Sequence, residues 1–461
     1  MKTNANFTLR RFIEDVAADD PAAVWRIEDR IGLDHDATAI VMELERTGRS
    51  PLVWFDDVGG SPFPVIANLF GTRRRYALGL GVPPERLIAD WGALGERRLP
   101  PVMRERGPVH DVVSTGADVD LGKLPIMLHF ACDAGRYITS GIVIAKDPDT
   151  GVRNASFHRM QVKGRNRLGT SLHSRRHLWN YMLRAEERGE NVPVAIVIGG
   201  HPTLAFGGLW KGPIATDEYE VIGGMMGTPL EIAPGITVPV EAPIHAEIVL
   251  EGQILAGVHE PEGPFAEFTG YASKRSTENV IEVTAILHRK HALYHDIIPG
   301  MSDEHTSLLA VPQEARLLRM LHTHYPNVTD VSYPKSGTCR LHAVIAMRHP
   351  APGQARLAAA AAIGDDLSLK LVVVVDDDVD VHDDAEVGWA LATRMQADQD
   401  IDILRNAMGA ILDPSNHDGL TAKMVIDATR PASDFPARHT LEPEAEARAR
   451  RCIAERFGRP A

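Results

Sequence analysis

The first segment of the chain alternates between helical and strand-like patterns. Leu9, Phe12, Ile13 and Val16 recur at the spacing that puts apolar side chains on one face of a helix. The run PLVWFDDV follows and is typical of a strand. Prolines beside the charged stretch RERG then interrupt the pattern, because proline lacks the amide that helix interiors need. We therefore predict an N-terminal α/β domain over residues 1–115.

Between residues 116 and 300 the pattern changes to short runs rich in β-branched residues, separated by glycine and proline. Examples are YITSGIVIAKD, VPVAIVIGG, AEIVLEGQILAGV and NVIEVTAILH. Many short strands at this spacing favour a barrel or a sandwich. Within this region the sequence also predicts one amphipathic helix over residues 177–188, ended by Gly189.

After residue 300 strands and helices alternate again, as in RLHAVIAMR, an alanine-rich helix and then LKLVVVVDDD. The continuous apolar run at residues 371–375 is typical of a parallel strand that is covered on both faces. The charged segment EPEAEARARR favours a surface or docking helix. We predict a C-terminal α/β domain over residues 301–440 and a terminal helix or tail over residues 441–461.

Composition narrows the classes of partner and compartment. Apolar residues make up 44% of the 461 residues, and the formal net charge is -13. This charge argues against a general nucleic-acid or anionic-membrane surface, because both need clustered excess Lys and Arg. The three cysteines lie far apart without CxxC spacing, which indicates neither a disulfide framework nor a thiolate zinc site. No signal peptide and no apolar run of roughly 18 residues is recognisable, so we expect a cytoplasmic protein without membrane insertion.

Two carboxylates stand close together in the stretch EPEGPFAEFTGY, which is too broken for regular structure. Glu262 and Glu267 would diverge by about 140 degrees on a helix. Gly263 and Pro264 permit a bend that turns both side chains inward. Paired carboxylates can then be held in different protonation states for acid and base chemistry. A solvated acidic turn remains the alternative interpretation of this stretch.

A basic cluster occupies residues 154–181 of this otherwise acidic chain. The planar fork of arginine suits phosphate or carboxylate, and histidines add hydrogen-bond donors or metal ligands. The cluster therefore indicates a local anion site, with an exposed basic turn and helix start as the alternative. Its members are His158, Arg159, His173, Arg175, Arg176 and His177.

Two further residues have both a functional and an ordinary interpretation. Glu218, in ATDEYEVIGG, is a candidate ligand for a hard cation, although acids in this position also favour a helix N-terminus. Lys423, in GLTAKMVIDATRP, is by default part of an ordinary salt bridge. The GxGxxG, GxxxxGK[ST] and HExxH patterns are absent, so standard dinucleotide, P-loop and zinc-protease chemistries lose support.

In this order and at these spacings the motifs resemble the UbiD family of prenylated-FMN-dependent decarboxylases. The resemblance is strongest over residues 137–430 and includes VVVVDDDVDVHD and GWALATRM. The family's Asn-x-x-x-x-Arg segment corresponds to Asn154 through Arg159, and its next metal ligand corresponds to His177, eighteen residues beyond the arginine. Histidine at this position, and glutamate rather than aspartate at Glu267, resemble the branch acting on aromatic and acrylic acids more than the ubiquinone-biosynthesis branch.

The resemblance implies a complete set of site residues. The metal ligands for Mn2+ or Mg2+ would be Asn154, His177 and Glu218, whose amide, imidazole and carboxylate suit such an ion; K+ is an additional candidate ion. The catalytic residues would be Arg159, Glu262 and Glu267. The contacts to the flavin or its phosphate would be Phe157, His158, Arg159, Ser174, Arg176, His177 and Lys423.

The resemblance also implies the fold and the reaction. We expect an α+β or α/β multidomain protein, with a central split β-barrel that binds prenylated FMN, flanking α/β domains and a C-terminal helix. The reaction would be the reversible, non-oxidative decarboxylation of an aromatic, heteroaromatic or α,β-unsaturated carboxylic acid through a covalent adduct with the flavin. Glu267 would donate the proton. A flavin prenyltransferase would supply the cofactor, and the chain would form a homodimer or homohexamer.

Two alternatives remain open at the level of sequence. A conventional FMN oxidoreductase on a split barrel would explain the phosphate-binding cluster but not the paired carboxylates. A non-catalytic assembly subunit would keep the fold, but it would not need Arg159, Glu262 and Glu267 at fixed spacing. The stretch SDEHTSLL, at residues 302–309, is a candidate for part of the substrate pocket wall.

Overall fold

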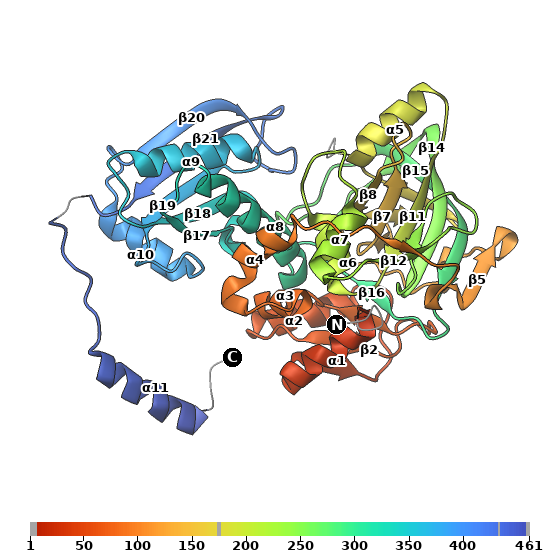
Figure 1. Cartoon of the computed structure of the whole chain (residues 1–461), viewed down its shortest axis with the longest axis horizontal. Helices are drawn as coiled ribbons and strands as arrows, with labels where there is room; N and C mark the ends of the chain where they lie inside the picture. The colour runs from red at the N-terminus through yellow and green to blue at the C-terminus, as the bar shows by residue number, and fades with distance from the viewer. Residues whose placement is uncertain (1–6, 173–176, 432–433, 458–461) are drawn as a thin grey trace.

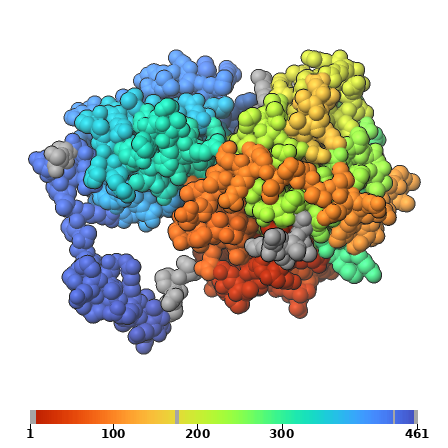
Figure 2. All heavy atoms as spheres, in the orientation of Figure 1, coloured from red at the N-terminus to blue at the C-terminus, as the bar shows by residue number. Residues whose placement is uncertain are grey.

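The computed structural model describes residues 7–172, 177–431 and 434–457 of the chain. Figure 1 shows the central β-sheet unit at the right, the C-terminal α/β unit at the left and the N-terminal unit below. The helix α11 (Pro443–Phe457) stands clear of the rest. Figure 2 shows the same separation in the space-filling view, and most side chains of α11 are exposed.

The N-terminal unit is built on a four-stranded sheet in the order β1-β2-β3-β16. Thr8 caps the first helix by accepting a hydrogen bond from the amide of Arg11, and the helix buries the apolar face predicted from the sequence. The fourth strand comes from the end of the central region and pairs in parallel with β3. The elements are α1 (Leu9–Asp19), β1 (Val24–Ile27), α2 (Asp36–Arg46), β2 (Leu52–Phe55), β3 (Val65–Ala67), α3 (Arg73–Leu80), α4 (Leu87–Leu94) and β16 (Tyr294–Asp296).

The central unit is a nine-stranded sheet in the order β6-β9-β10-β15-β14-β11-β7-β8, with β5 paired to β15. The sheet curls into an open half-barrel (Figure 1). The strands β8 and β9 are consecutive in the chain but lie toward opposite ends of the sheet order, so their connection crosses the open seam. The strands are β5 (Val112–Thr115), β6 (Tyr137–Ile138), β7 (Ile142–Lys146), β8 (Arg153–Phe157), β9 (Met160–Val162), β10 (Arg167–Thr170), β11 (Val192–Ile198), β14 (Ile248–Glu262) and β15 (Ser276–His288).

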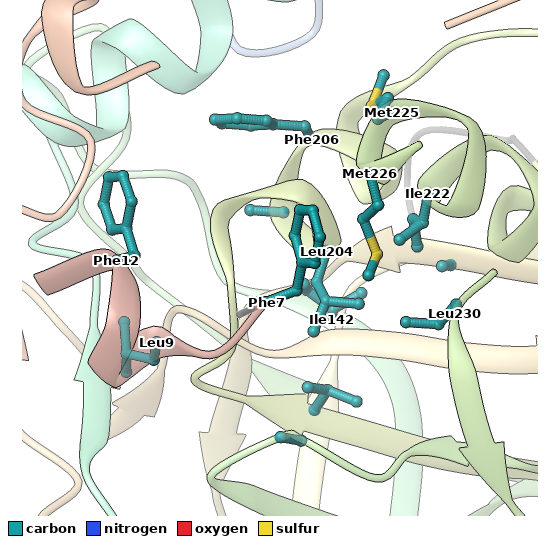
Figure 3. Packing of buried hydrophobic residues seen from close by; sticks show 14 of the residues in the cluster. Phe7, Leu9, Phe12, Ile142, Leu204, Phe206, Ile222, Met225, Met226 and Leu230 are labelled. Carbon is teal, nitrogen blue, oxygen red and sulfur yellow. The ribbon is translucent and has the colours of Figure 1, made fainter. Parts of the chain in front are cut away.

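Three helices and a small sheet complete the central unit. Figure 3 shows Phe206 from α6 and Met225 and Met226 from α7 in one apolar cluster, which also includes Phe12 from α1. This packing fixes α6 and α7 against the N-terminal unit and thereby positions the residues at their ends. The elements are α5 (His177–Glu187), α6 (Pro202–Leu209), α7 (Glu218–Met226), β4 (Val102–Met103), β12 (Glu231–Ala233) and β13 (Ala242–Pro243).

The C-terminal unit is a five-stranded sheet in the order β17-β18-β19-β21-β20, in which β18, β19 and β21 run parallel. One apolar cluster includes the alanine face of α9, and another includes residues of α10. The run at residues 371–375 is therefore a parallel strand covered on both faces, as predicted. The elements are α8 (Asp303–His322), β17 (Val328–Ser332), β18 (His342–Met347), α9 (Gln354–Asp365), β19 (Leu371–Asp376), α10 (Asp384–Arg394), β20 (Ile401–Met408) and β21 (Leu420–Ala428).

The structure confirms the predicted fold class, an α/β multidomain protein with a curled central sheet and a C-terminal helix. The sheets also exchange strands: β5 pairs within the central sheet, and β16 pairs within the N-terminal one. The boundaries at 115, 300 and 440 stay predictions. In the part of the chain that the structure describes, no helix is both long and apolar enough to cross a bilayer.

Candidate active site

A cavity of about 320 Å³ opens at the seam of the half-barrel, where α8 and the C-terminal unit close over it. From the barrel it is lined by His158, Arg159 and Glu267. Much of the remaining wall is aliphatic and includes Leu308 from α8 and Ile411 from the C-terminal unit. A mostly apolar pocket with a few convergent polar groups is the usual form of a small-molecule site.

Arg159 lies in the connection between β8 and β9 and binds two carboxylates at once. Its Nε donates to Oε1 of Glu262 over 3.1 Å, and its Nη2 donates to Oε2 over 2.9 Å. Its Nη1 donates to Glu267. The side chain of Glu262 is fully buried, and that of Glu267 is 10% exposed. One guanidinium thus serves two carboxylates, and only Glu267 borders the cavity.

The electrostatics of this triad keep the guanidinium charged. Burial lowers the pKa of Arg159, but the hydrogen bonds to Glu262 and the negative charges of Glu267 and Glu262 outweigh burial, so the pKa rises above its ordinary value. The ring of Phe265 also lies 5.0 Å from the guanidinium carbon, an additional favourable contact for a cation.

The loop after β14 turns both carboxylates inward, as the sequence predicts. Gly263 adopts a φ of 80°, a conformation that a Cβ disfavours, directly after Glu262 ends the strand. The amide of Ala266 donates to Oδ1 of Asp133 over 2.8 Å, and the amide of Glu267 donates to the carbonyl oxygen of residue 271 over 2.9 Å. Because both carboxylates are buried, they do not form a solvated acidic turn.

Asn154, His177 and Glu218 converge from β8, α5 and α7. The amide nitrogen of Asn154 lies 3.2 Å from Oε1 of Glu218, and Nδ1 of His177 lies 3.4 Å from the same oxygen. Burial raises the pKa of Glu218, opposed by its contacts with His177 and Asn154. An amide oxygen, exposed by flipping the Asn154 side chain, with an imidazole nitrogen and a carboxylate oxygen would suit Mn2+ or Mg2+. The residues therefore fit a divalent ion.

Of the remaining predicted cofactor contacts, two line the cavity and two lie outside the described residues. Phe157 and His158 line the cavity, and Nε2 of His158 lies 3.0 Å from the hydroxyl of Ser156. Ser174 and Arg176 lie outside the described residues. The other members of the basic cluster, His173 and Arg175, lie outside them too.

Lys423 is not brought together with the other predicted site residues. It lies on β21, and its Nζ donates to the carbonyl oxygen of Leu367 over 2.8 Å. Burial lowers the pKa of its ammonium group. Its contact with a flavin phosphate stays a prediction.

Several residues around the site were not singled out from the sequence. Tyr137 and Asp133 support the carboxylate loop, and His305 lines the cavity from the first turn of α8. The Nδ1 of His305 lies 2.8 Å from the carbonyl oxygen of Gly300, and burial lowers the pKa of its imidazole. Only the stretch SDEHTSLL pointed to this wall, because the contacts that assemble it are tertiary.

Comparison with protein families gives three matches in chain order. Residues 23–94 match the 3-octaprenyl-4-hydroxybenzoate carboxy-lyase N-terminal domain. Residues 101–302 match the Rift-related domain of the same family. Residues 306–428 match its C-terminal domain. Together these matches span well over half of the chain.

Individual relatives agree with the family matches. An anhydromevalonate phosphate decarboxylase from Methanothermobacter thermautotrophicus is 38% identical over 430 residues, covering 92% of this chain and 97% of that protein. The UbiD-class enzyme HmfF from Pelotomaculum thermopropionicum in complex with FMN has a TM-score of 0.90 at 37% identity, covering 95% of this chain and 98% of that one.

An evolved dimeric form of HmfF in complex with prFMN, prenylated FMN, has a TM-score of 0.87 at 35% identity, covering 95% of this chain and 98% of that one. UbiD-class relatives thus bind FMN or its prenylated form at a fold that this chain shares along nearly its whole length. The chain belongs to the UbiD family and is a carboxy-lyase of the UbiD class.

Proposed function

We propose that the chain catalyses the reversible, non-oxidative decarboxylation of an α,β-unsaturated, aromatic or heteroaromatic carboxylic acid with prenylated FMN as cofactor. The observation that carries this proposal is the single guanidinium of Arg159 shared by Glu262 and Glu267 beside the cavity. Loss of CO2 from an sp2 carbon needs a site that holds an anionic carboxylate, excludes water and then returns a proton. The three side chains and their apolar surroundings provide these functions.

The chain's own residues divide the work between them. Bound prenylated FMN supplies the electron sink that no side chain provides. Arg159 faces the cavity and orients the carboxylate of the substrate. Glu267 borders the cavity and delivers a proton to the carbon that has lost CO2. Glu262, buried behind the arginine, holds its guanidinium in position.

Among the three substrate classes we favour an α,β-unsaturated acid. The walls of the cavity include the aliphatic side chains of Leu209, Leu309 and Leu412, which pack against a carbon chain as well as against a ring. Anhydromevalonate phosphate, on which the Methanothermobacter relative acts by its name, is not aromatic. The resemblance to the branch acting on aromatic and acrylic acids does not by itself choose between these classes, and the preference rests on this relative.

Asn154, His177 and Glu218 are proposed to hold Mn2+ or Mg2+ beside the flavin phosphate. Phe157 and His158 would contact the flavin, as would Ser174 and Arg176 outside the described residues. Lys423 remains a proposed phosphate contact that would require its ammonium to leave the carbonyl oxygen of Leu367. We assign no residues to K+.

Reconstitution tests the proposed function against its alternatives. The chain is produced with and without a co-expressed flavin prenyltransferase, and each preparation is loaded with divalent metal. CO2 release and deuterium uptake from heavy water are then measured with anhydromevalonate phosphate, cinnamic acid, furoic acid and a phenolic acid. We expect turnover only after prenylation.

Two outcomes would contradict the proposal. Full activity with plain FMN and an electron donor would favour a conventional oxidoreductase. Binding of the prenylated cofactor without turnover of any acid, in either direction, would favour a non-catalytic assembly subunit.

We also propose that the chain forms a homodimer or homohexamer. The helix α11 stands clear of the body (Figure 2). Ile453 on this helix is 53% exposed. A second copy of the chain would cover this surface of α11. Light scattering of the full chain and of a chain ending before α11 measures the assembly, and the same number of subunits per particle in both would remove α11 from this role.

A further inference from the structure

Ser156 lies between the proposed cation site and the cavity. It is on β8, two residues after Asn154, a proposed cation ligand, and two residues before His158, which lines the cavity. Its hydroxyl oxygen lies 2.9 Å from Oδ1 of Asn154 and 3.0 Å from Nε2 of His158. Alternate residues of a strand point to the same face, which is why one hydroxyl reaches both neighbours. Ser156 therefore contacts one residue of each site.

The amide of Asn154 has its nitrogen toward the other two proposed cation ligands. Nδ2 donates to Oε1 of Glu218 over 3.2 Å and lies 3.5 Å from Nδ1 of His177. The amide oxygen accepts the hydroxyl hydrogen of Ser156. A divalent cation needs the oxygen as its ligand, because the amide nitrogen has no lone pair to offer. The amide must therefore turn over before Asn154 can bind an ion.

Turning the amide reverses the hydrogen bonds of Ser156. Nδ2 of Asn154 then faces the hydroxyl oxygen, and Asn154 is 4% exposed, so its N–H group needs an acceptor from the protein. The hydroxyl accepts this bond when its own hydrogen turns away from Asn154. Nε2 of His158 is the acceptor in reach, and among the described residues the hydroxyl has no third hydrogen-bond partner.

His158 carries the reversal into the cavity. A neutral imidazole that accepts a hydrogen bond at Nε2 has its own hydrogen on Nδ1. Nδ1 of His158 lies 3.5 Å from the carbonyl oxygen of Ser171, which also lines the cavity. A carbonyl oxygen only accepts, so it favours this placement of the hydrogen. The direction of the hydrogen bonds is then fixed from the amide of Asn154 to the wall of the cavity.

We infer that Ser156 is a positioning residue that lets Asn154 turn its amide oxygen toward a bound divalent cation, by passing the hydroxyl hydrogen on to His158. The cation thereby selects the nitrogen of His158 that carries the hydrogen in the cavity. This inference rests on the proposed cation site, but Ser156 and His158 are not among its proposed ligands. Loss of a residue that orients a metal ligand typically weakens metal affinity about 10–100-fold.

Titration of Mn2+ into the full chain tests this coupling without turnover. The free ion is measured by electron paramagnetic resonance, first without flavin and then with saturating FMN. We expect Ser156→Ala to weaken the Mn2+ affinity about tenfold, because the turned amide has no acceptor, and Ser156→Thr to restore it. His158→Phe should weaken the affinity about threefold, because the hydroxyl hydrogen then has no acceptor, and should add nothing to Ser156→Ala.

Ser276→Ala is the matched control, because the buried hydroxyl of Ser276 on β15 has no hydrogen-bond partner among the described residues. We expect this variant to bind Mn2+ as the wild type does. An unchanged affinity in Ser156→Ala, an equal loss in Ser156→Thr, or an additive effect of His158→Phe would each overturn the inference. If the wild type binds no Mn2+, the proposed cation site fails and this inference with it, whereas CO2 release by the prenylated holoenzyme still decides the proposed reaction.

Discussion

Glu45 connects the N-terminal unit with two elements of the C-terminal unit, and its charge can be tested directly. It lies on α2, and its Oε1 accepts a hydrogen bond from the amide of Asp303 at the start of α8 over 2.7 Å. Its Oε2 lies 3.3 Å from Nζ of Lys335, in the short 3-10 turn η7 (Lys335–Gly337) of the C-terminal unit. Lys335 also binds the carboxylate of Asp303. Glu45 therefore couples α2 of the N-terminal unit to α8 and η7 of the C-terminal unit.

The charge of Glu45 is costly in the folded protein. Burial raises its pKa from 4.5 to about 7, with a smaller contribution from the charge of Asp303, against the opposing effects of the Asp303 amide and of Lys335. The full shift corresponds to about 3 kcal/mol, which we reduce to about 2 kcal/mol because Lys335 is 43% exposed and solvent screens the site. The folded state binds the proton more tightly than the unfolded state, so this contribution to stability is present below about pH 4.5 and is lost by about pH 7.

Glu45→Gln keeps an oxygen acceptor for the amide of Asp303 and removes the titration. We expect the free energy of unfolding of the wild type, relative to the variant, to fall by about 2 kcal/mol between about pH 5 and about pH 8. Urea unfolding of both proteins in parallel measures this difference, since the other titrating groups cancel. Glu43→Gln on the same helix is the matched control, because Glu43 is exposed and pairs only with exposed Arg46 among the described residues. A difference that is constant or grows with pH would refute the reasoning.

Four further changes test the site and its support. Glu267→Gln should abolish turnover while the protein stays folded and flavin-bound; near-normal CO2 release would remove Glu267 from the mechanism. Glu218→Ala should lose bound metal and retained flavin together, as should treatment with a chelator, measured by metal analysis and flavin absorbance. Asp296→Ala leaves the fully buried His129 without its 2.9 Å partner and should cost about 3 kcal/mol in urea unfolding. Lys423→Met should weaken retention of the cofactor if its ammonium reaches the phosphate; unchanged retention would remove it from the site.

Local patterns in the sequence were sufficient to predict elements whose conformation depends on neighbouring residues. The continuous apolar run of β19 predicted a buried parallel strand, because only strands covered on both faces lack polar alternation. Gly263 predicted the turn that brings Glu262 and Glu267 together, because it permits a positive φ. Pairing between distant segments was not predictable in this way, as the parallel pairing of β16 with β3 shows.

Glu218 shows where interpretation of a single motif was limited. It does begin the helix α7, with Asp217 as the capping residue, so the ordinary interpretation of acids at a helix N-terminus is correct. It also converges with Asn154 and His177, which come from other elements. The two interpretations are compatible, and the choice between them needed either the resemblance to a family or the tertiary structure.

The position of Arg159 follows from the topology of the central sheet. In a closed barrel β8 and β9 would be hydrogen-bonded neighbours, and their connection would lie at a rim. Here the two strands lie toward opposite ends of the strand order, and the short connection between them crosses the open seam. That crossing puts Arg159 against the end of β14, where Glu262 can fill the space beneath it, and leaves Glu267 facing α8 and the cavity. A buried arginine is retained at such a seam only if carboxylates compensate its desolvation. The open seam that holds the cavity therefore also explains why the acid pair lies beside Arg159.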